Sequence, residues 1–184
     1  MFEILKFLGF TALFFRYIVW VASSLTTLEK KWGKVLLGQV IEGLLLLFFF
    51  HQLFGGKQIL PMHSFVAQLV GFFVTFLGVG IAFLAKKQLG KAWVYASAYR
   101  IVPKQELVTT GIYTYIRHPI YTSIALSYIG IELLSGSWLW VSFLFFFVPF
   151  YMQAKREEKL LAKHFGKKYK KYQQRTKMLI PFVL

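Results

Sequence analysis

Long apolar segments recur along this chain at a length that predicts membrane-spanning helices. Three of them lie at about 4–25, 34–54 and 64–86. Each holds the roughly 20 mostly apolar residues that a helix needs to cross the hydrocarbon core of a bilayer. We therefore expect three spans in the first half of the chain. Lys6 and Arg16 interrupt the first segment, which favours a retained span over a cleaved signal peptide.

A fourth apolar block, at about 119–153, is too long for one simple span. The sequence SGS at 135–137 breaks it near its middle, as a turn would. We expect a helical hairpin with arms at about 119–134 and 138–153. Both arms are short, so the hairpin either tilts or falls short of a full crossing. The pattern predicts an all-α integral membrane protein with about five transmembrane helices, the last two forming this hairpin.

The tail that begins at residue 155 has a helical pattern of a different kind. Lysines fill one face, and the residues that can share the other face are Leu160, Leu161, His164, Phe165 and Tyr169. This pattern predicts a C-terminal amphipathic helix lying at the membrane interface. It explains the lysines, but it does not explain the adjacent acids Glu157 and Glu158 at the membrane end of the helix.

Composition supports the membrane interpretation. Hydrophobic residues make up 57% of the 184 residues, whereas a soluble domain is typically about 45–50% apolar. The length suits one small bundle, so we expect a single domain, 1–184, with three N-terminal spans at 1–86 and a second half at 87–184. The chain has no cysteine, which excludes disulfides, thiolate nucleophiles and cysteine-ligated metals, and we expect no metal site.

Charge orients the segments. The chain has a net charge of +15, and five alternating segments place 19 of its 22 lysines and arginines on one side of the membrane. By the positive-inside rule that side is cytoplasmic, so the N-terminus lies outside and the C-terminal helix is cytoplasmic. We therefore expect a multi-pass protein of an inner or internal membrane. Its partners would be anionic membrane lipids, and no nucleic acid is expected.

Ionisable residues within apolar segments are costly, so they mark candidate sites. Glu42 lies in the middle of the second span. It can form a structural ion pair with Arg16, which is the favoured alternative, or it can line a cavity. His51 and Glu132 fall near the outer interface, where the cost of an ionisable group is small.

The loop at 86–121 is long, aromatic and nearly free of acids, and a connecting loop of this length is often functional. Pro119 suits the first turn of the helix that follows, which sets Arg117 and His118 at the helix N-terminus. Free backbone N–H groups there suit an anion such as a carboxylate or phosphate. On residue types alone, a lipid-phosphate anchor for Arg117 and an N-terminal cap for His118 are the simpler explanations.

Two ordered sequence blocks shift this balance. The first reads LVTTGIYTYIRHPIY at 107–121, and the second reads EEKLLAKHFGKKYKKY at 157–172, followed by Pro181. Together they resemble the signature of the isoprenylcysteine carboxyl methyltransferase family, a group of integral-membrane methyltransferases with phospholipid methyltransferase relatives. Upstream, LGKAW at 89–93 is similar to the family's L-G-x-x-W. The resemblance covers about the C-terminal half, and the first two segments carry no family motif.

The resemblance implies S-adenosylmethionine as the cofactor, bound at the cytoplasmic membrane face by the half at 87–184. The residues that it implies for cofactor binding are Gln105, Glu106, Leu107, Val108, Tyr113, His118, Pro119, Ile120, Tyr121, Glu157 and Glu158. A glutamate can pair with the cofactor's ammonium group or its ribose hydroxyls. His118 and helix-end N–H groups can hold the carboxylate. Tyr113, Tyr115 or Tyr121 can stack on the adenine or face the sulfonium.

The implied acceptor is lipophilic: a prenylated carboxylate, another isoprenoid or a phospholipid headgroup. We expect Arg100, Arg117 and Gln153 to contact it. Gln153 stands where some members that act on prenylated carboxylates carry arginine, which weakens that acceptor class, although Arg100 can supply the charge. An anionic acceptor needs positioning and desolvation more than a base, so no catalytic residue is assigned. An amine acceptor would need a base, for which His118 or a glutamate is available.

Two other functions are kept beside this one. A sterol-reductase-type protein that uses NADPH has a related block, which usually continues H-P-N-Y-x-G-E. Here the block continues HPIYTSI, without the asparagine and the acid, which argues against a nicotinamide cofactor. A non-enzymatic, lipid-binding membrane protein would also fit the lysines. Ser123, where many methyltransferase relatives have glycine, is a further departure that bears on close helix packing.

Overall fold

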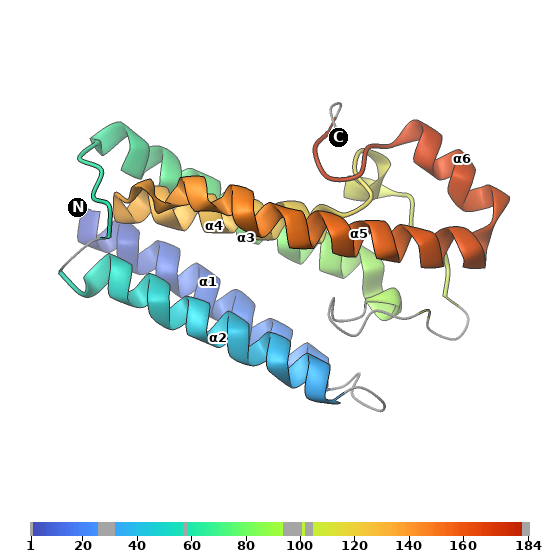
Figure 1. Ribbon diagram of the computed structural model, residues 1–184, viewed down its shortest axis with the longest axis horizontal. Coiled ribbons are helices and arrows are strands. Elements are labelled where there is room, and N and C mark those ends of the chain that lie inside the picture. The colour runs from blue at the N-terminus through green and yellow to red at the C-terminus, as the bar shows by residue number, and fades with distance from the viewer. Residues whose placement is uncertain (1, 26–31, 57–58, 94–100, 102–104, 182–184) are drawn as a thin grey trace.

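The computed structural model describes residues 2–25, 32–56, 59–93, 101 and 105–181, and all regular structure within these ranges is helical (Figure 1). The α-helices are α1 (Phe2–Leu25), α2 (Trp32–Phe54), α3 (Phe65–Leu89), α4 (Pro119–Ser135), α5 (Phe143–Phe165) and α6 (Lys167–Arg175). Short 3-10 helices are η1 (Gly90–Ala92), η3 (Gly111–Thr114) and η4 (Trp138–Ser142).

Helices α1, α2 and α3 confirm the three expected spans, with ends within three residues of the expected positions. Each is long and apolar enough to cross a membrane. Helix α3 begins where the Ser64 hydroxyl accepts a hydrogen bond from the Ala67 N–H, which satisfies one of the donors left open at a helix start. Among the described helices, only these three are both long enough and apolar enough to cross a membrane.

The break at 135–137 produces the expected hairpin between α4 and α5. Gly136 adopts a left-handed conformation, with φ of 75°, and its N–H bonds to the carbonyls of Glu132 and Leu133. Glycine adopts this conformation without the steric cost that a side chain would add. The segment that follows α2 packs on the hairpin tip, where Met62 N donates to Gly136 O at 2.6 Å and Trp138 N donates to Leu60 O at 2.9 Å.

The expected end of the second hairpin arm, at 153, is wrong. Helix α5 continues to Phe165, so the second arm and the start of the amphipathic tail form one helix. Gly166, with φ of 55°, then separates α5 from α6. The predicted apolar stripe does not persist: Leu160 and His164 lie on the exposed side of α5, whereas Leu161 and Phe165 are partly buried. Tyr169, which is buried, belongs to α6, beyond the break at Gly166.

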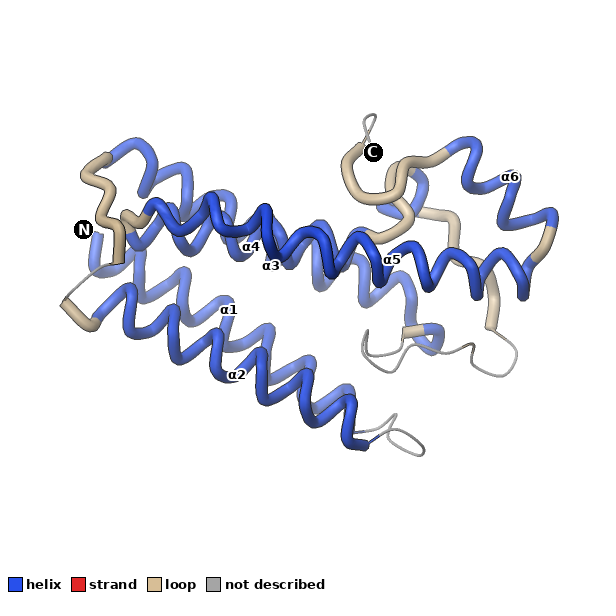
Figure 2. Tube along the Cα trace, in the orientation of Figure 1, coloured by secondary structure: helices blue, strands red, loops and turns tan. Residues whose placement is uncertain are grey.

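Small residues bring α3 and α4 into close contact along much of their length (Figure 2). A Cβ atom on Gly130 would lie 2.4 Å from the Thr75 backbone nitrogen, and one on Gly71 would lie 2.4 Å from the Leu134 nitrogen. Ser123, the departure noted above, is buried and donates to Ile120 O within its own helix at 2.6 Å. Its hydroxyl is therefore satisfied without separating the two helices.

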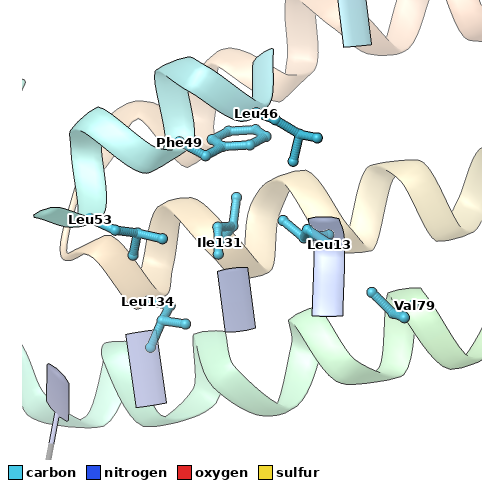
Figure 3. Close-up of a cluster of buried hydrophobic side chains, with 7 residues drawn as sticks. All are labelled: Leu13, Leu46, Phe49, Leu53, Val79, Ile131 and Leu134. Atoms are coloured by element: carbon cyan, nitrogen blue, oxygen red, sulfur yellow. The ribbon is translucent and has the colours of Figure 1, made fainter. Parts of the chain in front are cut away.

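An apolar core joins the N-terminal helices to the hairpin (Figure 3). Its side chains converge from four helices, α1 to α4, and they are Leu13, Leu46, Phe49, Leu53, Val79, Ile131 and Leu134. Glu132 lies beside this core with no exposed surface. Because Glu132 is buried within the protein, the expectation that its position carries only a small cost is wrong, whereas His51 is exposed.

The C-terminal segment folds back onto the stretch that precedes α4, at the end of the molecule away from the N-terminus (Figure 1). Arg117 N donates to Lys177 O at 2.9 Å, His118 N donates to Met178 O at 3.0 Å, and Lys177 N donates to Tyr115 O at 3.1 Å. We call the segment 107–121, which contains Arg117, His118 and Pro119, the RHP block. Since these bonds join residues about 60 positions apart, the tail and the RHP block form one structural unit.

Candidate functional site

A cavity of about 590 Å³ lies between the N-terminal helices and the C-terminal half. This volume falls in the range of roughly 300–1,000 Å³ that is usual for small-molecule sites. Its apolar wall comes from α1, α2, α4 and α5 and includes Leu13, Trp20, Leu45, Leu46, Phe49 and Ile124. Its polar end comes from the 105–121 stretch and α5 and includes Gln105, His118, Tyr121 and Glu157.

His118 is the central residue of the polar end. Pro119 occupies the first turn of α4, as expected, which places His118 directly before the helix. The imidazole is only 6% exposed and makes no capping hydrogen bond, so the cap explanation is wrong. The backbone N–H groups of Arg117 and His118 donate to the tail, so they are not the free anion donors that the sequence suggested.

Glu157 and Glu158 lie on either side of the imidazole and have different surroundings. His118 Nδ1 is 3.5 Å from Glu157 Oε2, and His118 Nε2 is 3.5 Å from Glu158 Oε1. Burial by itself lowers the pKa of the imidazole, but the hydrogen bonds and negative charges of the two carboxylates outweigh burial and raise the pKa above its usual value. The imidazole of His118 therefore lies between two acids that favour its protonated form.

Glu158 fastens the tail to the RHP block. Its Oε1 accepts from Arg117 Nε at 2.5 Å, and its Oε2 accepts from Gln173 Nε2 at 3.1 Å. Burial raises the pKa of this carboxyl, but hydrogen bonds and charges from His118 and Arg117 outweigh it and lower the pKa to about 2. Arg117 also donates to the carbonyls of Gln173 and Thr176, which excludes its role as a free lipid-phosphate anchor.

Glu157 faces the cavity, which Glu158 does not line. Its Oε1 accepts from the Tyr121 hydroxyl and, at 3.2 Å, from Gln153 Nε2. The Tyr121 ring stacks beside His118, with ring centroids 5.7 Å apart. The cavity's polar end thus offers a carboxylate, an imidazolium and an aromatic face side by side.

Most of the residues that the resemblance implied gather around this cavity. Those that line it are Gln105, Glu106, Leu107, Val108, Tyr113, Arg117, His118, Pro119, Ile120, Tyr121, Gln153 and Glu157. Tyr115 does not line it and is 57% exposed. Arg100 lies outside the described residues.

Residues of the N-terminal spans complete the cavity. Arg16 and Glu42 form the expected ion pair, and both also line the cavity, so the two alternatives for Glu42 hold together. Trp20 and Trp93 line it as well, with their rings 6.1 Å apart at 84°. Sequence reasoning missed these tryptophans as site residues, because aromatic residues are frequent throughout the spans.

Comparison with known proteins agrees with this site. The sequence profile of the phospholipid methyltransferase family matches residues 66–168, which contain the RHP block and both glutamates. The protein-S-isoprenylcysteine O-methyltransferase of Schizosaccharomyces pombe (strain 972 / ATCC 24843) is 31% identical over 111 residues, which cover 58% of this chain and 46% of that protein. The chain thus matches about half the length of this relative. Since the profile covers more than half of the chain, the chain belongs to the phospholipid methyltransferase family.

Proposed function

We propose that this protein transfers a methyl group from S-adenosylmethionine to a lipophilic acceptor at the cytoplasmic membrane face. The observation that carries the proposal is the single cavity that joins the His118–Glu157 end to an apolar wall built by α1 and α2. A polar cofactor and a lipid can meet in such a cavity. Family membership supports this function over the NADPH-dependent alternative.

The residues of the polar end fit the charges of S-adenosylmethionine. The imidazolium of His118 can hold a carboxylate, and the cavity-facing oxygen atoms of Glu157 can accept from an ammonium group or from ribose hydroxyls. The Tyr121 ring offers its face to an adenine or a sulfonium. When bound, the cofactor supplies an electrophilic methyl group on sulfur. Glu158 and Arg117 contribute by holding the tail closed over this end.

The apolar wall is suited to an acceptor that arrives from the bilayer. Leu45, Phe49 and Ile124 exclude water from the reacting atoms, which favours attack by an anionic oxygen or a neutral amine. An amine acceptor must lose a proton. Because the two carboxylates favour the protonated form of His118, the better-placed base is Glu157, which faces the cavity and accepts a hydrogen bond from the Tyr121 hydroxyl.

The topology is part of the proposal. The single domain, 1–184, lies in an inner or internal membrane with the N-terminus outside and the basic C-terminal half, 87–184, in the cytoplasm. The exposed lysines of α6 then meet anionic lipid headgroups, and no nucleic acid is involved.

Calorimetric titration of the detergent-purified protein tests the function, with S-adenosylmethionine and NADPH as ligands. We expect saturable binding of S-adenosylmethionine and none of NADPH. The variants Glu157→Ala and His118→Ala should lose this binding while the helix content measured by circular dichroism is kept. Binding of NADPH instead would support the reductase alternative, and binding of neither ligand to folded protein would support the non-enzymatic one.

A further inference from the structure

The ion pair between Arg16 and Glu42 lies inside the apolar half of the cavity. Arg16 is only 8% exposed and lies nine residues before the end of α1. At the rise of an α-helix, this places it roughly 14 Å from that end, well within the span. Charged residues at such a depth are costly and usually serve a function. The family profile begins at residue 66, so this pair lies outside the part of the chain that the profile matches.

Positive charge exceeds negative charge around the pair. The Arg16 guanidinium lies 5.6 Å from the centroid of the Trp20 ring, and Lys86 Nζ lies 4.4 Å from the same ring. Lys86 also donates to Ser23 Oγ, a neutral partner. Two cations therefore surround Trp20, with Glu42 as the one carboxylate that pairs with either of them among the described residues. Lys86 does not line the cavity, but its charge beside Trp20 adds to that of Arg16 and favours a negatively charged ligand group at this part of the wall.

The guanidinium also has unused hydrogen-bonding capacity. Its Nη2 donates to Glu42 Oε1, while Nε is buried without an acceptor among the described residues. An arginine has five N–H donors and no acceptor, and a buried donor without a partner costs free energy. Oxygen atoms from a ligand would meet this need, whereas a hydrocarbon or an ammonium group would not.

A purely structural role, holding α1 against α2, does not require this pair. The two helices are already joined away from the cavity, where Gln39 Nε2 donates to Ser24 Oγ at 3.0 Å and Tyr17 donates to Gln39 O at 3.3 Å. Neither Ser24 nor Gln39 lines the cavity. Apolar residues of similar size often stabilise a buried site as well as an ion pair does.

We propose that Arg16, held in place by Glu42, binds an oxyanion of the lipid acceptor, either a carboxylate or a phosphate. Trp20 belongs to a buried cluster with Ala82 and Trp93, against which Ile120 packs. Arg16 lies four residues, about one helical turn, before Trp20 on α1. The oxyanion site thus lies roughly 6 Å further along α1 than Trp20, the rise of about one helical turn. This inference rests on the proposed function in one respect, that the lipid bound here is the methyl acceptor.

The test uses oleate carrying a carbon-13 label in its carboxyl group, added to the intact protein in a neutral detergent and followed by NMR. We expect a shifted carboxyl resonance and saturable binding. The double variant Arg16→Leu/Glu42→Leu should weaken this binding by at least about tenfold, the loss that removal of a charged hydrogen bond predicts. The matched control Ser24→Ala/Gln39→Leu, which removes a contact between the same helices, should bind as the wild type does. Oleylamine should bind all three proteins equally.

Arg16→Lys is a second variant for the case in which the double variant does not fold. It keeps the charge but loses the planar fork, and it should weaken oleate binding less than the double variant. Unchanged oleate affinity in every folded Arg16 variant, an equal loss in the control, or no oleate binding to the wild type would each overturn the proposal.

Two further measurements separate this proposal from the proposed function. S-adenosylmethionine binding should survive in Arg16→Leu/Glu42→Leu. If the wild type binds oleate through Arg16 but binds no S-adenosylmethionine, the lipid site stands and the methyltransferase function fails. Radiolabelled methyl transfer to oleate but not to oleyl phosphate would identify the oxyanion as the reacting group. If oleate and oleyl phosphate both bind but neither is methylated, the oxyanion is a recognition group set apart from the reacting atom.

Discussion

At the scale of single residues, the adjacent glutamates show how neighbouring positions acquire different roles. Successive side chains of an α-helix point about 100° apart, so two adjacent residues can face different surroundings. Glu157 faces the cavity and Tyr121, whereas Glu158 faces Arg117. The resemblance implied both as cofactor ligands, and it could not separate them because the direction of each side chain depends on the rotation of α5.

Substituting the two glutamates one at a time should show that Glu158 contributes mainly to stability and Glu157 mainly to the binding of S-adenosylmethionine. Glu158→Ala leaves Arg117 buried without its carboxylate, and loss of one partner of a buried pair typically costs about 3–5 kcal/mol. Glu157→Gln preserves shape and an acceptor oxygen for Tyr121, so it should destabilise the protein less than Glu158→Ala does, while it weakens S-adenosylmethionine binding by tenfold or more. Thermal unfolding and calorimetric titration measure the two effects. Equal destabilisation by both variants would contradict this division.

The imidazole between the two acids predicts a specific dependence of stability on pH. The folded pKa of His118 is raised above 6.5, so its contribution is complete below that pH and is lost as the pH rises through the folded value. The pKa of Glu158 is lowered from 4.5 to about 2, so its contribution is complete above 4.5 and is lost as the pH falls toward 2.

Unfolding midpoints from pH 4.5 to 9 should therefore decline on the alkaline side for the wild type. In His118→Asn the decline should be smaller, because that group no longer titrates. Parallel alkaline declines in the two proteins would show that another group is responsible.

At the scale of elements, turn residues predicted the breaks between helices well, whereas the end of an apolar run predicted the end of a helix poorly. The SGS turn lies where it was expected because glycine and serine favour a turn there. The end of the second hairpin arm was misplaced because the apolar run stops near residue 153, while lysine, glutamate, leucine and alanine continue the helix to Gly166. Apolar content marks the membrane boundary, and the backbone hydrogen bonds continue beyond it.

The close contact between α3 and α4 can be tested by comparing two glycine substitutions on α3, one at the contact and one away from it. A Cβ atom on Gly78 would lie 2.7 Å from the Ser127 nitrogen, whereas one on Gly80 would meet nothing within 4 Å. Gly78→Ala must shift backbone and should destabilise the protein by about 1–3 kcal/mol. Gly80→Ala should be neutral or stabilising by up to about 1 kcal/mol, because alanine favours a helix. Thermal unfolding in detergent measures both, and similar midpoints for the two variants would contradict the close contact.

At the scale of the whole molecule, the tail and the RHP block form one end and the hairpin tip forms the other. The two family blocks predicted which residues gather at the first of these ends, and both blocks carry side chains that line the cavity there. The contribution of α1 and α2 could not be predicted in the same way. Arg16 and Glu42 are far apart in the sequence, and only the packing of two spans brings them to the cavity wall.

The hairpin tip also bears on how many times the chain crosses the membrane. The tip bonds to the segment after α2 through Trp138 N and Leu60 O. Arms that reach that segment extend as far as the outer ends of α2 and α3. This contact supports a full crossing by α4 and α5, in place of a hairpin that stops within the bilayer.

Single cysteines can test both orientation and crossing, because the natural chain has none to give background. His63 follows α2, Trp138 lies at the hairpin tip and Lys170 lies in α6, and all three side chains are exposed. A membrane-impermeant maleimide added to intact cells should label His63→Cys and Trp138→Cys, whereas Lys170→Cys should react only after permeabilisation. The reverse pattern would invert the topology. Labelling of His63→Cys without Trp138→Cys, even after permeabilisation, would show that the tip stays within the bilayer. We expect the first pattern for two reasons. By the positive-inside rule, 19 of the 22 basic residues favour a cytoplasmic location for one end. The hairpin tip is bonded to the loop at the other end.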